Sequence, residues 1–219
     1  MIVVIGSPTG RSADGEMTAA GTASRVALAA AKLGGSVQLV GKTGDDPAAD
    51  AIVLDLARGG VGHVALLRDP ARPTPVEPGL SEDLDGPDAP EADGATTSQT
   101  AAGAGPALEA ADVDLGLRYL TDYRVIVLAE PSAPDVVAIA SDAARWAEAR
   151  LILVVGAGET VPVGLPDDVV VFEAPEADPD GVFADLVGGF AAALDGGTDP
   201  EVAFRASIAS DGWSGADAG

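Results

Sequence analysis

The chain has 219 residues, a hydrophobic content of 47% and a formal net charge of −23, with 35 acidic residues against 12 basic ones. So negative a field repels nucleic acid and anionic lipid, and the composition excludes both as main partners. Cysteine is absent and His63 is the single histidine, which excludes a disulfide framework and thiolate or histidine-rich metal sites. The length is sufficient for one full α/β domain with a sizeable core.

The acidic, lysine-poor and alanine-rich composition is typical of a salt-rich cytosol, because high ionic strength screens charge repulsion. A halophilic source is the first interpretation, and a generally acidic protein is the alternative. The apolar run Met1–Ile5 has no basic region before it and a glycine directly after it. It therefore predicts a buried strand rather than a signal peptide or a membrane span, and a cytoplasmic protein.

The first third of the chain alternates between strand and helix patterns. A polar loop is predicted between the first strand and the first helix, and glycine pairs mark the ends of the helices. This alternation predicts a parallel α/β layout. The predicted elements are a strand over Ile2–Ile5, a helix over Ala19–Leu33, a strand over Ser36–Val40, a helix that begins at Gly44-Asp45-Asp46-Pro47 and ends near Arg58, and a strand over Val61–Leu67.

Residues 70–107 lack apolar periodicity and are rich in Pro, Gly, Asp, Glu, Ser and Thr, which predicts a disordered acidic linker. Regular patterns then resume and continue to Ser210. We therefore predict one α/β domain made of residues 1–69 and 108–210, with a loose tail over residues 211–219. The later elements are helices near Asp112–Leu120, over Pro134–Ala149, after Gly181 and over Pro200–Ser210, and strands over Arg124–Ala129, Leu151–Val155 and Val169–Glu173.

Three sequence runs carry a likeness to a known family. An alanine-rich helix after Ala20-Gly21 ends in Leu33-Gly34, and Gly41–Asp46 reads Gly-Lys-Thr-Gly-Asp-Asp. Near the C-terminus, Gly181–Phe190 reads GVFADLVGGF. These runs resemble the PfkB-type (ribokinase-like) carbohydrate kinases, whose corresponding segments contain a Gly-Gly pair, a Leu-Gly helix end, Gly-x-x-Gly-Asp-Asp and Gly-Ala-Gly-Asp-Ala-Phe-x-Gly-Gly-Phe.

The resemblance implies a mostly parallel sheet flanked by helices, and phosphoryl transfer from ATP, with Mg²⁺, to a sugar or related small alcohol. The segment between the first strand and the first helix is short, and the acidic linker replaces further strands. We therefore expect the lid sheet of the family to be missing.

The resemblance also assigns the catalytic turn, where backbone N–H groups bind phosphoryl oxygens and an aspartate acts as base. Gly181 keeps the first glycine and Gly188 belongs to the helix body, and both are candidate anion-binding residues. Phe183 replaces the second glycine, where we expect it to crowd the anion pocket, and Ala184 replaces the catalytic aspartate. Asp185 is the candidate base, although one residue on a helix is a rotation of about 100° and should turn it away. A locally shifted alignment would bring Asp185 or Asp180 to the position of the base, but it breaks the match downstream.

The remaining candidates rest on the same resemblance. Arg25 takes the place of the family's asparagine that faces the sugar, and together with Gly21 and Asp14 it is a candidate substrate-binding residue. An ion pair on the helix surface is the alternative for Arg25, and a plain loop residue is the alternative for Asp14. Glu159, in Gly156-Ala-Gly-Glu, stands in for the family's metal-associated Asn-x-x-Glu as an anion or nucleotide ligand, although a simple turn at the strand end is the alternative.

Three functions follow from these observations. The first is a carbohydrate kinase homologue that uses ATP and Mg²⁺. The second is a non-catalytic pseudokinase that binds a sugar or a nucleotide, or has a regulatory role. The third is a scaffold that forms a homodimer through an exposed sheet edge.

Overall fold

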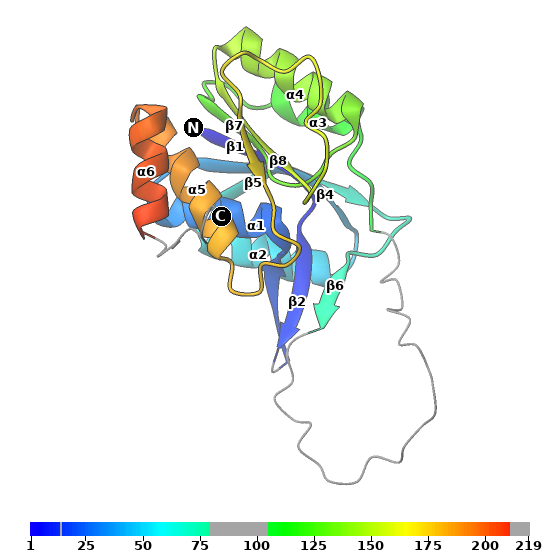
Figure 1. Ribbon diagram of the computed structural model, residues 1–219. Coiled ribbons are helices and arrows are strands. Elements are labelled where there is room, and N and C mark those ends of the chain that lie inside the picture. Colours follow the sequence, from blue (N-terminus) through cyan, green and yellow to red (C-terminus); the bar gives the residue numbers. More distant parts are fainter. Residues whose placement is uncertain (14, 79–104, 211–219) are drawn as a thin grey trace, which may run out of the picture.

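The computed structural model describes residues 1–13, 15–78 and 105–210, and its centre is a six-stranded sheet (Figure 1). The strand order is β5-β4-β1-β7-β8-β9, and every neighbouring pair is parallel. The parallel α/β fold predicted from the strand–helix alternation is therefore confirmed. The strands are β1 (Ile2–Ile5), β4 (Val37–Gly44), β5 (Val61–Asp69), β7 (Val125–Leu128), β8 (Arg150–Val155) and β9 (Val170–Glu173).

Helices cover both faces of this sheet. Alternate residues of β1 show the division, because Ile2 and Val4 are buried in one core cluster while Val3 and Ile5 are buried in the other. Strands buried on both faces read as continuous apolar runs, which is why Ile2–Ile5 contains no polar residue. One face is covered by α1 (Gly21–Lys32), α2 (Pro47–Arg58) and α5 (Val182–Asp195), with α6 (Pro200–Ser210) packed on α5, and the other by α3 (Ala110–Arg118) and α4 (Pro134–Ala147).

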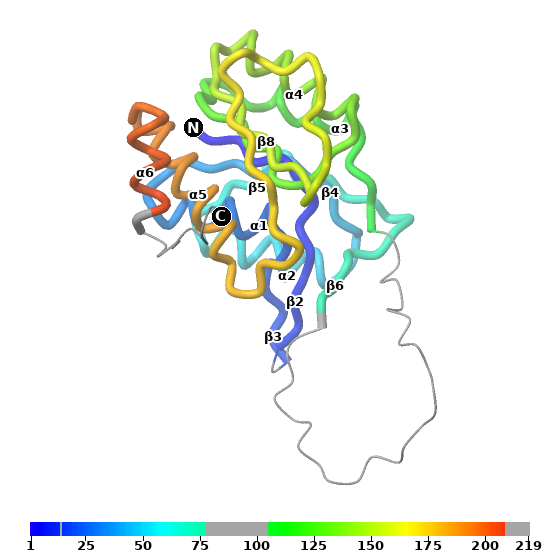
Figure 2. The backbone as a smooth tube through the Cα atoms, viewed as in Figure 1, coloured from blue at the N-terminus to red at the C-terminus, as the bar shows by residue number. Residues whose placement is uncertain are grey.

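A second, three-stranded sheet projects from the body below α2 (Figure 2). It consists of β2 (Thr9–Ala13), β3 (Glu16–Ala20) and β6 (Val76–Pro78), in the order β3-β2-β6. The expectations of a missing lid sheet and of a polar loop between the first strand and helix were therefore wrong. These strands are short and their residues are mostly polar, so they lack the apolar alternation from which strands are recognised.

The predicted linker boundary at residue 70 also needs correction. Thr74 is buried, and its hydroxyl accepts a hydrogen bond from the Gly44 N–H (3.0 Å) and donates one to Asp46 (2.9 Å). Residues 70–78 therefore belong to the folded domain. The predictions of disorder over 79–104 and of a loose tail over 211–219, and the candidate Asp14, lie outside the described residues.

Asp46 connects the two sheets through helix α2. As predicted, it caps α2, because Oδ1 accepts from the Ala49 N–H (2.9 Å) and Pro47 stands at the start of the helix. Its Oδ2 accepts from the Thr74 N–H (2.7 Å). Burial alone would raise the pKa of Asp46, but the hydrogen bonds from Thr74 and Ala49 outweigh it and lower the pKa below its ordinary value.

Within the described ranges, no helix combines the length and apolarity that crossing a membrane requires.

We predict that Asp46→Ala lowers the free energy of unfolding by about 1–3 kcal/mol, because the helix cap is lost and the amide of Thr74 loses its acceptor. Since the folded pKa of Asp46 is depressed, its stabilising effect is present above the unfolded pKa and is lost as the pH falls through the folded pKa. The difference between the variant and the wild type should therefore shrink in acid. Urea titrations at several pH values measure it, and Asp45→Ala, at an exposed neighbour, is the control. Equal effects of the two substitutions would contradict the assignment.

Candidate functional site

The strand order changes direction at the carboxyl ends of β1 and β7. The chain runs from β1 through β4 to β5 on one side of the sheet, and from β7 through β8 to β9 on the other. Such a reversal of direction is where open α/β sheets bind their ligands. Gly6 and Ser7 follow β1 at this point, and Glu130 follows β7.

Glu130 is a half-buried carboxylate at the switch point. The Ser7 N–H donates to its Oε1 at 2.7 Å. A Cβ atom at Gly6 would lie 2.7 Å from the Ala23 Cβ and 3.2 Å from the Glu130 carboxyl carbon, so only glycine lets α1 and Glu130 approach this closely. Burial raises the pKa of Glu130, and the hydrogen bond from Ser7 only partly offsets this effect. A carboxyl group with a raised pKa at a ligand-binding position is a candidate functional residue.

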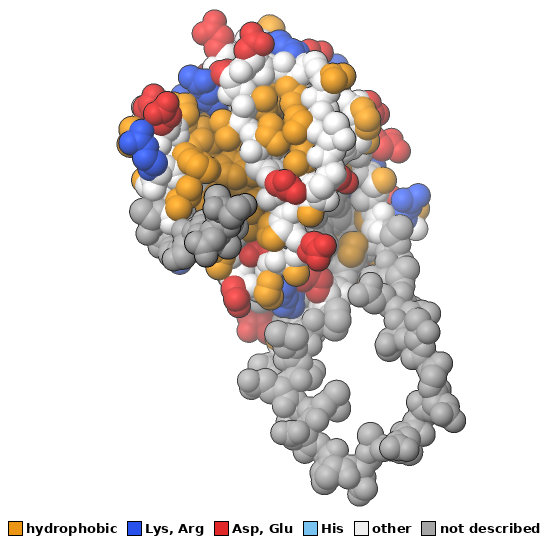
Figure 3. Space-filling view, in the orientation of Figure 1, with side chains coloured by type: hydrophobic (Ala, Val, Ile, Leu, Met, Phe, Trp, Pro, Cys, Tyr) orange, Lys and Arg blue, Asp and Glu red, His pale blue; other side chains and the backbone are white. Residues whose placement is uncertain are grey.

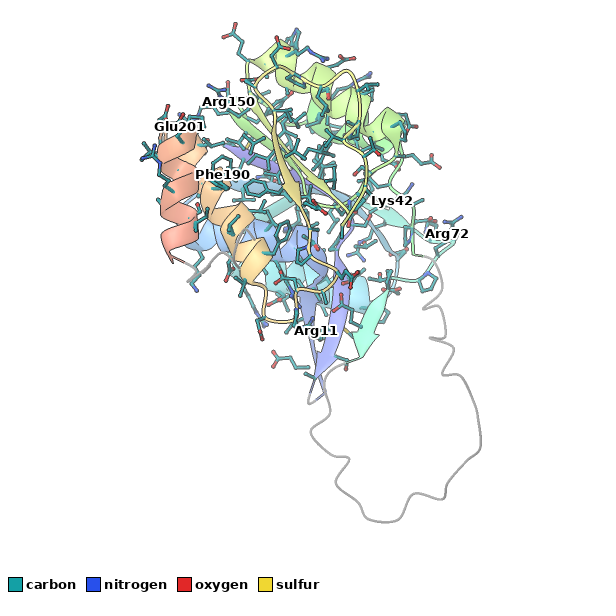
Figure 4. All side chains as sticks on the ribbon, viewed as in Figure 1. Arg11, Lys42, Arg72, Arg150, Phe190 and Glu201 are labelled. Carbon is teal, nitrogen blue, oxygen red and sulfur yellow. The ribbon has the colours of Figure 1, made fainter. Side chains whose placement is uncertain are left out.

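A cleft of about 300 Å³ lies between the small sheet, the start of α1 and the turn before α5. Arg11 and Glu77 line it from neighbouring strands of the small sheet and form an ion pair (2.9 Å). Figure 4 places Arg11 on β2, near the start of α5. The residues that line the cleft are Arg11, Gly21, Thr22, Arg25, Glu77, Ala177, Asp178 and Pro179.

Arg25 bridges α1 and the turn before α5. Its guanidinium donates to the backbone carbonyl of Asp178 and lies beside Gly181. Among the described residues it forms no ion pair with a carboxylate, so the alternative of a surface ion pair is not what the structure contains. Gly21 and Arg25, both predicted as substrate-binding residues, therefore come together at the cleft.

The first N–H groups of α5 are bonded to a carboxylate of the chain itself. Asp178 Oδ1 accepts from the Phe183 N–H and Asp178 Oδ2 accepts from the Ala184 N–H, both at 3.1 Å. Gly181, at φ 76°, makes the turn that brings the aspartate back over the helix end. In this arrangement the turn offers neither N–H group to an external phosphate.

Phe183 does not crowd the cleft, contrary to the expectation from its position in the turn. Its side chain is buried at 4% exposure, and its ring makes an edge contact with Phe172 at 6.4 Å between centroids. The turn aims the side chain at the core and leaves only the backbone of this residue at the helix start. Ala184, in the position of the family's aspartate, is also buried.

Asp185 lies on a different surface from the cleft. It is exposed and borders a groove between α1, α5 and α6, together with Lys32 and Ser207. Gly188 is buried where α5 touches α1, since a Cβ there would lie 2.7 Å from the Val26 carbonyl oxygen. Neither residue contributes to the lining of the cleft.

Glu159 folds back on its own turn. Its Oε2 accepts from the Gly156 N–H at 3.0 Å, and Glu173 accepts from the Gly158 N–H at 2.8 Å. Within the described part of the chain, no three acidic or histidine side chains gather in a way that would hold a metal ion. Mg²⁺ that enters with a nucleotide needs only one or two carboxylates besides the phosphates, so the groups that would hold the phosphates are those of the α5 turn. With Asp178 bonded there, the residues present do not fit a phosphoryl group.

The model of the pfkB family carbohydrate kinases matches residues 2–81. The matched segment is less than half of the 219 residues, and over it the chain is similar to that family. The match includes Arg11, Gly21, Arg25 and Glu77 of the cleft, whereas Glu130 and the α5 turn lie beyond it. A search of curated protein sequences found no match.

Solved structures share the ribokinase-like fold over nearly the whole chain. The ribokinase of Arabidopsis thaliana, complexed with ribose and ATP, is 15% identical with a TM-score of 0.61, and the alignment covers 96% of this chain and 90% of that one. Aminoimidazole riboside kinase of Salmonella enterica, complexed with aminoimidazole riboside and an ATP analogue, is 14% identical with a TM-score of 0.62, and the alignment covers 96% of this chain and 90% of that one. A protein of E. coli assigned as a ribokinase II, in complex with ATP and Mg²⁺, is 14% identical with a TM-score of 0.64, and the alignment covers 96% of this chain and 91% of that one. At these identities the likeness establishes the fold.

Four residues described above were not predicted from the sequence: Arg11, Glu77 and Asp178 of the cleft, and Glu130 after β7. Arg11 and Glu77 belong to strands that carry no strand signal. Glu130 did carry a signal, because it is the first acidic residue after a buried apolar strand, where functional groups of α/β sheets gather. Asp178 opens the turn that contains Gly181.

We predict that Glu130→Gln changes the pH dependence of stability. The raised folded pKa means that the stability contributed by Glu130 is fully present below its unfolded pKa and is lost as the pH rises through the folded pKa. Glutamine stays uncharged and keeps an oxygen that accepts from Ser7. The melting temperature of the variant relative to the wild type should therefore increase from pH 4.5 to pH 8. The exposed Glu176→Gln is the control, and a pH-independent difference for Glu130→Gln would contradict the burial of this charge.

Proposed function

We propose that this chain is a homologue of the pfkB carbohydrate kinases that binds a sugar or a related small alcohol in the cleft and transfers no phosphoryl group. The cleft lies between the small sheet of this ribokinase-like fold, the start of α1 and the turn before α5, so a small ligand there would meet side chains from several elements.

One observation carries the non-catalytic part of the proposal. The N–H pair at the start of α5 is bonded to Asp178, and the only acid next to the catalytic position, Asp185, is exposed on another surface. Phosphoryl transfer requires a base within hydrogen-bonding reach of the acceptor hydroxyl and donors for the charge on the phosphoryl oxygens. At the α5 turn, position 184 holds no carboxyl group, and the N–H groups of Phe183 and Ala184 are already bonded to Asp178.

The chemistry of the cleft favours a ligand with several hydroxyl groups. Arg11 and Arg25 present donors, Glu77 presents acceptors and the hydroxyl of Thr22 is both. Ala23, on the same turn of α1 as Gly21 and Thr22, adjoins the switch point at Gly6, where Glu130 supplies a further carboxylate. A sugar satisfies such a mixed set because each hydroxyl group both donates and accepts.

The second candidate is an active carbohydrate kinase with ATP and Mg²⁺. It is favoured by the match of residues 2–81 to the kinase family and by neighbours whose structures contain ATP, ribose and Mg²⁺. Activity would require the turn to rearrange so that Asp178 leaves the N–H pair and a carboxylate such as Asp185 reaches the acceptor. The notion that the chain binds a ligand at all is common to both candidates.

We predict that a sugar or small alcohol from a broad panel raises the melting temperature without being phosphorylated. A ligand at about 100 times its dissociation constant adds about 2.7 kcal/mol, or roughly 5–10 °C for a chain of this size. The scan is run in molar KCl with and without Mg-ATP, and phosphorylation is followed by ADP release. Arg25→Ala should abolish the shift while Asp185→Ala leaves it unchanged. ADP release that Asp185→Ala abolishes would instead establish the kinase.

We also predict that Asp178→Ala binds ATP or pyrophosphate with an apparent affinity at least tenfold higher than that of the wild type. The affinity is measured from the rise of the melting temperature with ligand concentration. The substitution frees two N–H groups at a helix start, where anions bind favourably, and it removes a repelling charge. Loss of the cap lowers the free energy of unfolding of the unliganded protein by about 1 kcal/mol. Asp180→Ala, an exposed aspartate in the same turn, is the matched control. If both variants bind ATP as the wild type does, Asp178 does not block the turn.

A further inference from the structure

Among the basic residues of the chain, Arg25 alone is half-buried without an acidic partner in the described ranges. All 12 basic residues lie in those ranges, and eight of them form ion pairs with carboxylates. Lys32, Arg58 and Arg72 form none and are exposed. The guanidinium of Arg25 donates to the neutral backbone carbonyl of Asp178. Because a guanidinium has five N–H donors, further donors are left for a ligand.

The lack of a counter-ion at Arg25 stands out in so acidic a chain. The sequence has 35 acidic residues, and acidic side chains are spread over the face seen in Figure 3 with only a few basic ones among them. A charge that is partly removed from water costs free energy unless other groups compensate it. A carbonyl compensates part of this cost, and a carboxylate bonded through two parallel N–H groups compensates more. Arg25 is therefore suited to an acidic ligand.

The two carboxylates that line the cleft already have partners. Glu77 accepts from the Thr9 hydroxyl and from the Arg11 guanidinium, both at 2.9 Å. Asp178 accepts from the first N–H groups of α5. Within the described residues, Arg25 is thus the cation of the cleft whose charge no carboxylate pairs.

The wider surroundings of the cleft are negative. On the small sheet, the α5 turn and α5, four described acidic side chains are exposed: Glu16, Glu176, Asp180 and Asp185. The other described acids of α2, α5 and the switch point are bonded within the chain: Asp46, Asp50, Asp55, Glu130 and Asp195. α1 contains no acidic residue.

These acids disfavour any anion, but they do not act equally on all anions or at all salt concentrations. Because Coulomb energy is proportional to charge, a dianion is repelled twice as strongly as a monoanion. In molar salt the Debye length is about 3 Å, so exposed charges that do not touch the ligand are largely screened. A carboxylate in direct contact with Arg25 keeps its attraction. The surroundings therefore favour one negative charge, held at Arg25.

We propose that the ligand of the cleft is a sugar acid, a small polyhydroxy compound with one carboxylate, and that Arg25 binds this carboxylate. The inference rests on the proposed function, because it names the ligand class of the same cleft. A volume of about 300 Å³ suits a small molecule. Glu77 and the hydroxyl of Thr22 line the same cleft and are suited to bond the hydroxyl groups of the ligand.

Arg25 then determines the selectivity between an acid and a neutral sugar. In the kinases that the sequence resembles, an asparagine that faces the sugar takes this position. An uncharged amide bonds hydroxyl groups but leaves the charge of a carboxylate unpaired, whereas a guanidinium forms two parallel charge-assisted bonds with it. The substitution Arg25→Asn therefore removes the charge and keeps a group that forms hydrogen bonds.

Matched ligands test this assignment. Glucose, glucuronate and glucose 6-phosphate share a sugar ring and differ in charge at one carbon, and galactose with galacturonate and glucitol with gluconate extend the comparison. Apparent affinities are measured in molar KCl from the rise of the melting temperature with ligand concentration. The variants are Arg25→Asn, Arg25→Lys and Arg58→Asn. Arg58 is the matched control, because it is exposed on α2, forms no ion pair with a described residue and lies outside the cleft.

We expect at least one acid to bind at least tenfold more tightly than its neutral counterpart, and Arg25→Asn to remove this preference. Arg25→Lys keeps a positive charge without the planar fork, so it should keep part of the preference. Arg58→Asn should bind as the wild type does. Circular dichroism verifies that the variants fold, and the comparison of ligands on the wild type does not depend on any variant.

A neutral sugar that binds as tightly as its acid, or a phosphate that binds more tightly, overturns the sugar-acid assignment and leaves the proposed function standing. A preference for the acid that persists in Arg25→Asn, or that Arg58→Asn also loses, overturns the role of Arg25. If no sugar, acid or phosphate stabilises the wild type, the proposed function itself fails, and this inference fails with it.

Discussion

The close contact between α1 and α5 determines the geometry of the candidate site. At Gly188 the two helices approach so closely that a Cβ atom would lie 2.7 Å from the Val26 carbonyl oxygen and 3.0 Å from the Ala30 nitrogen. Because the helices are this close, Arg25 reaches across to the Asp178 carbonyl at their common end. A side chain at position 188 would push α5 outward and separate these groups.

The α5 turn differs from the phosphoryl-transfer turn that it resembles in two complementary ways. The carboxylate expected at position 184 is an alanine, and a carboxylate from position 178 occupies the N–H groups instead. Both differences concern the same few residues: Asp178 accepts from the N–H groups of Phe183 and Ala184, and the side chain of Ala184 carries no acid. The cleft, in contrast, keeps polar groups that a ligand requires.

The main sheet and its helices could be predicted from the sequence because their signals are local. Apolar runs such as Ile2–Ile5, glycine pairs after helices and the Asp46-Pro47 start of α2 each specify an element without reference to the rest of the chain. The small sheet could not, since its strands are polar and their partners lie far apart in the chain, as Arg11 and Glu77 do. The burial of the Phe183 side chain in the core could not be predicted for a similar reason, because it depends on contact with the ring of Phe172 on another element.

The hydrogen bonds between Asp46 and Thr74 have a mechanical consequence for the cleft. The small sheet continues directly into α1 through β3, and Thr74, two residues before β6, is fastened to the start of α2. Its two ends are therefore connected to two helices that are packed on the main sheet. A movement of the small sheet away from the body must either turn the first turns of both helices or break the bonds to Asp46. The wall of the cleft that the small sheet forms is thus fixed at both ends. Opening of the cleft on this side would also displace the start of α1, which carries Gly21 and Arg25.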